Sequence, residues 1–159
     1  MPDLHFAQDR AAAPEGDAAA TLAGPAPSTV AQAFFAGRAS LVPLICNTDR
    51  RGALLPIDFR DLPFHPCRAF VVQDVPAGTT RGGHAHRRGS QVLVRLAGRI
   101  LVEMRVGGEQ AHCLLDRSDR GLLVGPGVWA QQTYVDPGTI LLVFASEPYD
   151  PADYFAGPA

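Results

Sequence analysis

The stretch SQVLVRLAGRILVEMRVGGEQAHCLLD, residues 90–116, decides the fold class. It contains three short apolar runs, at 90–97, 99–106 and 111–116, and glycine-containing turn signals separate them. Runs of this length between such signals predict β-strands. The sequence Val106-Gly107-Gly108-Glu109 predicts a tight hairpin between the second and third strands, because glycine accepts the left-handed backbone of such turns.

The same pattern extends in both directions along the chain. Further apolar runs are LVPLIC (41–46), GALLPIDF (52–59), RAFVVQDV (68–75), GLLVG (121–125), VWAQQTYV (128–135) and TILLVFAS (139–146). Nine or so strands, spaced by about ten residues and separated by turn signals, predict an all-β sandwich or barrel.

The two ends of the chain differ from this central part. Small residues and prolines dominate the first thirty positions, which predicts an arm that adds little to the core. Residues 29–38 fit a short helix that Ser28 or Thr29 would cap and Gly37 would end. The predicted division is residues 1–40 as an N-terminal arm, 41–155 as one domain and 156–159 as a tail.

Composition excludes several classes of protein. The chain has 159 residues, of which 47% are hydrophobic and 19% charged, as is typical of one globular domain. No apolar run approaches the ~18–20 residues that span a bilayer, and the N-terminus lacks the pattern of a signal peptide, so we expect a cytoplasmic location. The net charge of −2 gives no reason to expect nucleic acid as a partner.

Two residue types limit the chemistry. All 14 basic residues are arginine, so guanidinium groups would have to hold any anionic ligand. The three cysteines, Cys46, Cys67 and Cys113, are scattered, which predicts free thiols rather than a disulfide framework or a thiolate metal site.

The segment RGGHAHRRGSQVLV, residues 81–94, carries the candidate chemistry. In a strand, His84 and His86 would project from the same face, with their Cα atoms roughly 7 Å apart. Two such imidazoles could bind a metal, transfer protons or lie on a solvated sheet face. The preceding Gly82-Gly83 pair allows the backbone to bend or to approach a ligand closely.

Glycines and a polar residue surround this pair at regular distances. Gly78 lies six residues before His84, Gln91 lies five after His86, and Gly98 lies seven after Gln91. This pattern resembles the first motif of the cupin superfamily. The resemblance implies a cupin-type double-stranded β-helix, a jelly-roll barrel, which agrees with the predicted strands.

Metal-binding cupins carry Glu at the place of Gln91 and supply a further His from a later strand. Here the later segment GPGVWAQQTYV (125–135) has no His, Asp, Glu or Cys, and neither His65 nor His112 lies at the matching place. Two imidazoles and an amide are a poor donor set for a divalent metal. We therefore predict no metal and favour proton transfer, which suits an imidazole near neutral pH.

A more specific resemblance covers residues 41–155. The sequence is similar to the WxcM-like branch of cupins, the dTDP-4-keto-6-deoxyhexose 3,4-ketoisomerases. The matching runs are DRRGALLPI (49–57), PCRAFVVQD (66–74), RGGHAH (81–86), QVLVRLAGRILVEM (91–104), GLLVGPGVW (121–129) and LLVFASEPYDPADYF (141–155).

The resemblance implies an activity and a set of site residues. The substrate would be a dTDP-linked keto-deoxysugar whose ketone moves from C4 to C3, without a cofactor, in a homodimer. The implied catalytic residues are His84 and His86. The residues predicted to bind the substrate are Arg51, Arg68, Arg81, Gln91 and Trp129.

Some positions depart from the family pattern. The family carries His or other polar groups at the places of Ala130 and Thr133, Glu at Ser90, and Tyr near Phe70 and Val71. Two other functions therefore stay open. One is a non-catalytic cupin that binds a sugar nucleotide; the other is a cupin epimerase of keto-sugars, in which Tyr134 would act as the acid beside a histidine base.

Overall fold

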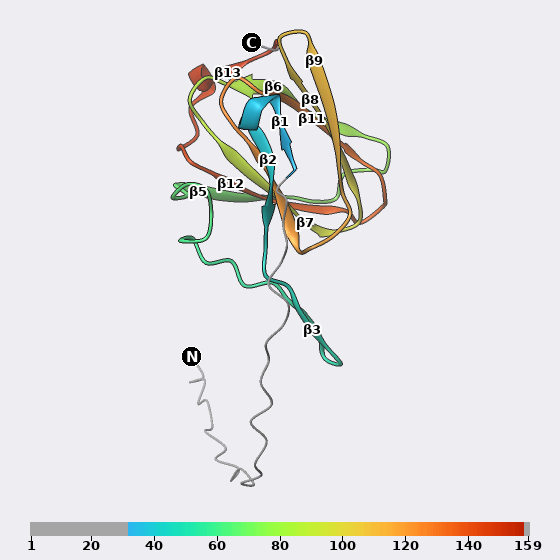
Figure 1. Ribbon diagram of the computed structural model, residues 1–159. Helices are drawn as coiled ribbons and strands as arrows, with labels where there is room; N and C mark the ends of the chain where they lie inside the picture. Colours follow the sequence, from blue (N-terminus) through green and yellow to red (C-terminus); the bar gives the residue numbers. More distant parts are fainter. Residues whose placement is uncertain (1–31, 158–159) are drawn as a thin grey trace, which may run out of the picture.

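The computed structural model describes residues 32–157. Strands in the order β1-β2-β10-β7-β12-β5 form a six-stranded sheet, and strands in the order β13-β6-β11-β8-β9 form a five-stranded sheet. Strands β3 and β4 form a separate hairpin. Figure 1 shows the two larger sheets curving around a shared interior, with this hairpin extending away from them.

The described strands are short and every pairing between them is antiparallel. Their bounds are β1 Ala33–Phe34, β2 Ala39–Pro43, β3 Asn47–Asp49, β4 Gly52–Leu54, β5 Arg68–Val72, β6 Thr80–His86, β7 Gln91–Ala97, β8 Ile100–Val106, β9 Glu109–Leu115, β10 Arg120–Val124, β11 Trp129–Tyr134, β12 Ile140–Ala145 and β13 Tyr154–Phe155. Two 3-10 turns, η1 (Phe35–Gly37) and η2 (Pro151–Asp153), complete the described elements. The all-β prediction is confirmed.

The hairpin predicted at residues 106–109 is present. Val106 pairs with Glu109 across the two-residue loop Gly107-Gly108, and Gly107 has a φ of 54°. Along β8 the residues alternate between buried and more exposed positions, with Ile100, Val102 and Met104 turned inward. This period of two is what a sheet with one buried face requires.

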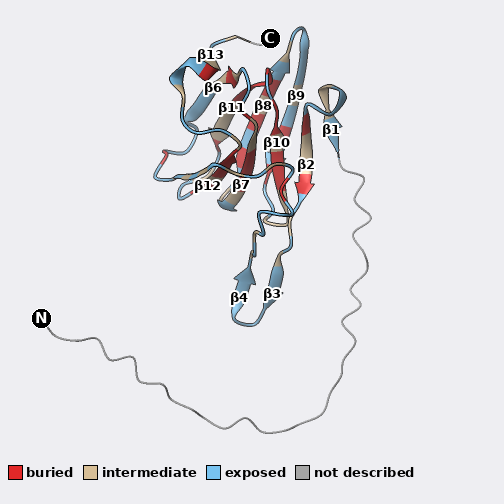
Figure 2. Cartoon of the chain, turned by 90° about the vertical axis from the view of Figure 1, so that its left-hand side faces the viewer, coloured by how far each residue is buried: buried red, intermediate tan, exposed pale blue. Residues whose placement is uncertain are grey.

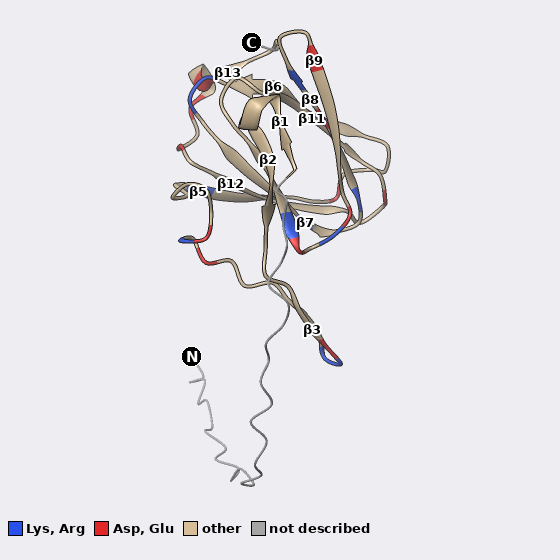
Figure 3. Cartoon of the chain, in the orientation of Figure 1, with Lys and Arg blue, Asp and Glu red and all other residues tan. Residues whose placement is uncertain are grey.

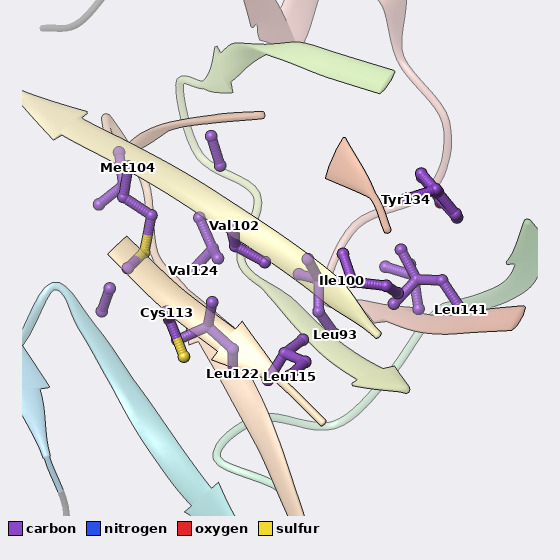
Figure 4. Close-up of a cluster of buried hydrophobic side chains, with 14 of the residues drawn as sticks. Leu93, Ile100, Val102, Met104, Cys113, Leu115, Leu122, Val124, Tyr134 and Leu141 are labelled. Atoms are coloured by element: carbon purple, nitrogen blue, oxygen red, sulfur yellow. The ribbon is translucent and has the colours of Figure 1, made fainter. Parts of the chain in front are cut away.

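Strand β7 is buried on both faces at Val92, Leu93 and Val94, which explains the continuous apolar sequence there. Leu93 belongs to the main core between the two sheets, shown in Figure 4. Val92 and Val94 belong to a second cluster on the outer face of the six-stranded sheet, with Leu62 and Phe144. Figure 2 shows the buried residues concentrated in the sheets, whereas the β3–β4 hairpin is exposed.

The helix predicted at residues 29–38 is wrong over its described part. Phe34 lies in β1, which pairs with β2, and residues 35–37 form a single 3-10 turn. Phe35, Ala36 and Gly37 all have positive φ, which an α-helix excludes. Because β2 pairs along its whole length with β10, the sheet begins before the predicted boundary at residue 41. The remainder of the predicted arm, residues 1–31, lies outside the described residues.

No helix within residues 32–157 has the length and apolar character needed to cross a membrane.

Candidate functional site

A cavity of about 180 Å³ lies between the two sheets. Polar residues from β5, β6, β7, β11 and β13 share its wall with aliphatic residues of the core. The residues that line it are Arg68, Phe70, Val72, Arg81, Gly82, His84, His86, Gln91, Leu93, Val124, Val128, Ala130, Gln132, Tyr134, Leu141, Val143 and Tyr154. Figure 3 shows that the charged residues otherwise lie mainly near strand ends and in loops.

A β-bulge in β6 directs three polar side chains into this cavity. Ala130 of β11 pairs with His84 and Gln131 pairs with Gly82, so Gly83 has no partner in the register. Both glycines have positive φ, 82° and 77°. Residues three apart in a regular strand face opposite sides, but the extra residue brings Arg81 to the same side as His84 and His86.

His86 is held at both ring nitrogens. Its Nδ1 lies 3.0 Å from Oδ2 of Asp153, and its Nε2 lies 3.1 Å from Nε2 of Gln91. Because the Gln91 amide nitrogen is a donor, the His86 Nε2 accepts, and Nδ1 carries the proton that is donated to Asp153. The side chain of His86 is only 12% exposed, so this arrangement holds the ring in one orientation.

Asp153 is a buried carboxylate at the end of η2. It accepts hydrogen bonds from the backbone N–H groups of Arg88, at 2.9 Å, and Gly89, at 3.2 Å, as well as from His86. Burial acts to raise the pKa of Asp153, but these hydrogen bonds together outweigh it and hold the pKa below its usual 3.8. Asp153 therefore provides a fixed negative charge behind His86.

The environment of His84 is different. Among the described residues, no side chain hydrogen-bonds its ring, which packs against His86 and Tyr154 at centroid distances of 5.1 and 4.6 Å. Burial, and secondly the nearby His86, lowers the pKa of His84 below its ordinary 6.5, and the backbone of Gly82 opposes this only in part. His84 is thus a neutral base facing the cavity, whereas His86 is anchored.

The cavity wall includes two guanidinium groups. Arg81 is exposed at its rim, and Arg68 lies over the ring of Phe70 at 4.5 Å and that of Tyr149 at 5.1 Å. The structure therefore brings five of the predicted residues to one cavity: His84, His86, Arg68, Arg81 and Gln91.

Two predicted substrate-binding residues lie elsewhere. Trp129 is buried, but its ring packs under the guanidinium of Arg105 at 4.8 Å and does not line the cavity. Arg51 lies in the β3–β4 hairpin, where its guanidinium binds Asp49 across an exposed turn. In one copy of the chain neither side chain contacts the cavity, so their binding role stays a prediction.

Residue patterns alone did not identify Asp153 and Tyr154 as members of the site, and they named Tyr134 only as the acid of the epimerase alternative. Asp153 and Tyr154 belong to the segment PYDPADYF (148–155), which contains the short turn η2. Tyr154 pairs with His86 through the short strand β13, and its ring lies 4.5 Å from that imidazole. The clustering of acidic and aromatic residues there was the available signal.

Within residues 32–157, no three His, Cys, Asp or Glu side chains are grouped as a metal site would require. The polar groups that contact the imidazole pair are the Gln91 amide and the Asp153 carboxylate. Both of them hydrogen-bond His86. The donor set therefore fits hydrogen bonding and proton transfer better than metal coordination.

Comparison with known proteins gives the evolutionary context. The family described as FdtA, WxcM-like, C-terminal, matches residues 38–158. TDP-4-oxo-6-deoxy-alpha-D-glucose-3,4-oxoisomerase of Aneurinibacillus thermoaerophilus is 36% identical over 107 residues, which are 67% of this chain and 77% of that protein.

Solved structures agree with this match. QdtA, a sugar 3,4-ketoisomerase from Thermoanaerobacterium thermosaccharolyticum in complex with TDP, is 33% identical, with a TM-score of 0.72 over 76% of this chain and 88% of QdtA. A histidine-to-asparagine mutant of QdtA was solved with TDP-4-keto-6-deoxyglucose. The RmlC epimerase of Mycobacterium tuberculosis, 16% identical with a TM-score of 0.65 over 79% of this chain and 72% of RmlC, shares the fold.

These findings confirm the predicted cupin-type barrel and the predicted family. The matching region includes every described residue of the cavity, and the relatives with the higher identities are sugar 3,4-ketoisomerases. The chain therefore belongs to the FdtA family, the WxcM-like 3,4-ketoisomerase branch of the cupin fold.

Proposed function

We propose that this protein is a 3,4-ketoisomerase of a TDP-linked 4-keto-6-deoxyhexose, with His84 as the base and His86 as its anchored partner. The observation that carries the proposal is the difference between the two imidazoles. His84 faces the cavity with no side-chain hydrogen-bond partner among residues 32–157 and has a lowered pKa, whereas Asp153 and Gln91 hold His86. Environments that differ in this way assign different roles to two titratable groups.

The proposed reaction moves one ketone without net oxidation. Neutral His84 removes the proton from C3, beside the C4 ketone, and the C4 oxygen takes up a proton to give an enediol. The C3 hydroxyl then loses its proton to form the new ketone, and a proton is delivered to C4. Because the C–H next to a ketone is only weakly acidic, the step needs a base whose pKa lies near the working pH and donors for the developing oxyanion.

Cavity size indicates which part of the substrate enters the barrel. About 180 Å³ is below the ~300–1,000 Å³ typical of sites that enclose a whole drug-sized ligand. We infer that the cavity takes the sugar, while the nucleotide lies outside. Arg81 at the rim and Arg68 beside Tyr149 are the guanidinium groups placed to bind the diphosphate, which suits their planar donor geometry.

Incubation with TDP-4-keto-6-deoxyglucose in deuterated water, followed by NMR of the sugar protons, tests this function. Wild type should move the ketone to C3 and incorporate deuterium at C4. His84→Asn should lose at least a hundredfold in rate, in line with the contribution of a general base of ~10²–10⁴-fold. His112→Asn is the matched control, because His112 is an exposed histidine on β9.

The same spectra separate the alternatives. Deuterium at C3 or C5 with the ketone retained at C4 would support an epimerase, whose fold the RmlC comparison shares. Tight binding of the sugar nucleotide by wild type without any deuterium exchange would support a non-catalytic binding protein. Either result would overturn the ketoisomerase proposal.

A further inference from the structure

The hydroxyl of Tyr134 is buried and has no hydrogen-bond partner among residues 32–157. The whole side chain of Tyr134 is fully buried. Buried polar atoms in native proteins are nearly always satisfied, and an exception calls for a specific explanation such as a bound ligand. It is the single buried side-chain N or O atom among the described residues with this property.

The tyrosine lies in the wall of the cavity, away from the histidines. Ala130, Gln132 and Tyr134 alternate along β11 and all line the cavity. Ala130 pairs with His84, so Tyr134 begins about 13 Å further along the strand, near the other end of the cavity. Leu141, which Figure 4 labels in the same core cluster, lines the same cavity.

The chemistry of this position favours a neutral oxygen as the missing partner. Burial raises the pKa of Tyr134 to about 12, although the charge of Arg81 opposes the shift. The phenol therefore stays protonated at physiological pH and can donate one hydrogen bond and accept others. The aliphatic side chains of Val72, Leu141 and Val143 share this wall, which disfavours placing an unpaired anion there.

We propose that the Tyr134 hydroxyl binds an oxygen of the sugar inside the barrel and so orients the ring toward His84. This inference rests on the proposed function. The guanidiniums of Arg68 and Arg81 retain solvent access, whereas Tyr134 has none, so the phenol lies deeper than the groups that suit a diphosphate. A hydroxyl or keto oxygen of the sugar then satisfies a donor that residues 32–157 leave unsatisfied.

Tyr134→Phe tests this contact because it removes one oxygen and keeps the ring. The ligand-free variant should melt at the wild-type temperature or above, since the hydroxyl has no partner to lose. Affinity for TDP alone should be unchanged. Affinity for TDP-4-keto-6-deoxyglucose, measured by calorimetry in a His84→Asn background that prevents turnover, should fall by about five- to hundredfold, the range for a buried hydrogen bond left unmade.

A matched control is Thr133→Val, which deletes the hydroxyl of a neighbouring residue on β11 that does not line the cavity. Equal affinity for the keto-sugar nucleotide with and without the Tyr134 hydroxyl would overturn the inference. An equal loss of affinity for TDP in Tyr134→Phe would also overturn the inference, because it would place the contact on the nucleotide or diphosphate. A lower melting temperature of the ligand-free variant would overturn it as well, because it would reveal a structural hydrogen bond. These results leave the proposed function intact, whereas a wild type that neither binds nor converts the keto-sugar nucleotide overturns both.

Discussion

At the scale of single residues, the site depends on two neighbouring imidazoles with different surroundings. Asp153 and Gln91 hold both nitrogens of His86, and His84 packs against that ring while facing the cavity. The contrast arises from one buried carboxylate that is contributed from far along the chain. Three hydrogen-bond donors fix Asp153, so the anchor of His86 is itself rigid.

The lowered pKa of His84 predicts how activity depends on pH on the acid side of the profile. A base whose pKa is depressed stays neutral down to lower pH, so kcat/KM should fall only as the pH drops below 6.5. In His86→Gln the pKa of His84 should rise, because the neighbouring imidazole that helps to lower it is lost, but it should remain below 6.5 because burial persists. NMR titration of the His84 ring in both proteins measures this; a midpoint above 6.5 in the wild type would contradict it.

Removal of the Asp153 carboxylate should destabilise the fold. Asp153→Asn replaces an acceptor of three hydrogen bonds by a group that can satisfy only part of them, so we expect a loss of about 1–3 kcal/mol in the free energy of unfolding at pH 7. Because the pKa of Asp153 lies below 3.8 in the fold, this difference should be complete above the unfolded-state pKa and vanish as pH falls through the folded value.

Urea unfolding at several pH values measures this difference. Asp116→Asn serves as the control, because Asp116 is exposed. A stability difference for Asp153→Asn that grew toward acid pH would contradict the assignment.

At the scale of elements, the bulge in β6 determines which side chains of that strand face the cavity. A regular strand would turn Arg81 away from the histidines, and the unpaired Gly83 restores it to their side. Glycine is required at position 82 for two reasons. Its φ is 82°, and a Cβ there would lie 2.9 Å from the backbone oxygen of Ala130 and 2.6 Å from Oε1 of Gln132.

Gly82→Ala should therefore reduce both stability and activity. Left-handed strain and the clash with a backbone oxygen predict a loss of about 1–3 kcal/mol in the free energy of unfolding. Gly108→Ala is the matched control, since no atom lies within 4 Å of its added Cβ and its φ is not positive. Urea denaturation and the NMR assay measure the two effects. If Gly82→Ala behaved like Gly108→Ala, the bulge would not be needed for the site.

At the scale of the whole molecule, the β3–β4 hairpin pairs with no other strand of residues 32–157. Leu54 in this hairpin and Ile45 just before it are 64% and 60% exposed. An isolated two-stranded hairpin is marginally stable in water, so an additional contact is expected. The homodimer implied by the family resemblance would supply one, and Arg51 would then lie at the interface between the two copies.

Leu54→Glu should therefore weaken the dimer. Light scattering should give about twice the chain mass for the wild type and a concentration-dependent shift toward one chain mass for the variant, because a charge replaces an apolar contact. Leu114→Glu, which changes an exposed leucine on β9, is the control. A wild type that scatters as a single chain would contradict the prediction.

The sequence by itself determined most strands of the two larger sheets, the tight turn at Gly107-Gly108, the family and the histidine pair. Alternation and turn preferences act over a few residues, so they can be read locally. The same reasoning failed for residues 32–38, where pairing with β2 overrides the helical pattern.

Only the tertiary structure decided which polar groups share the cavity. Its lining extends from Arg68 to Tyr154 along the chain, and Asp153 reaches His86 from 67 positions away. Trp129 and Ala130 are adjacent in sequence, yet only Ala130 lines the cavity. The physical reason is that side chains along a strand alternate between its two faces, while the pairing of distant strands and the bulge at Gly83 determine which face meets the cavity.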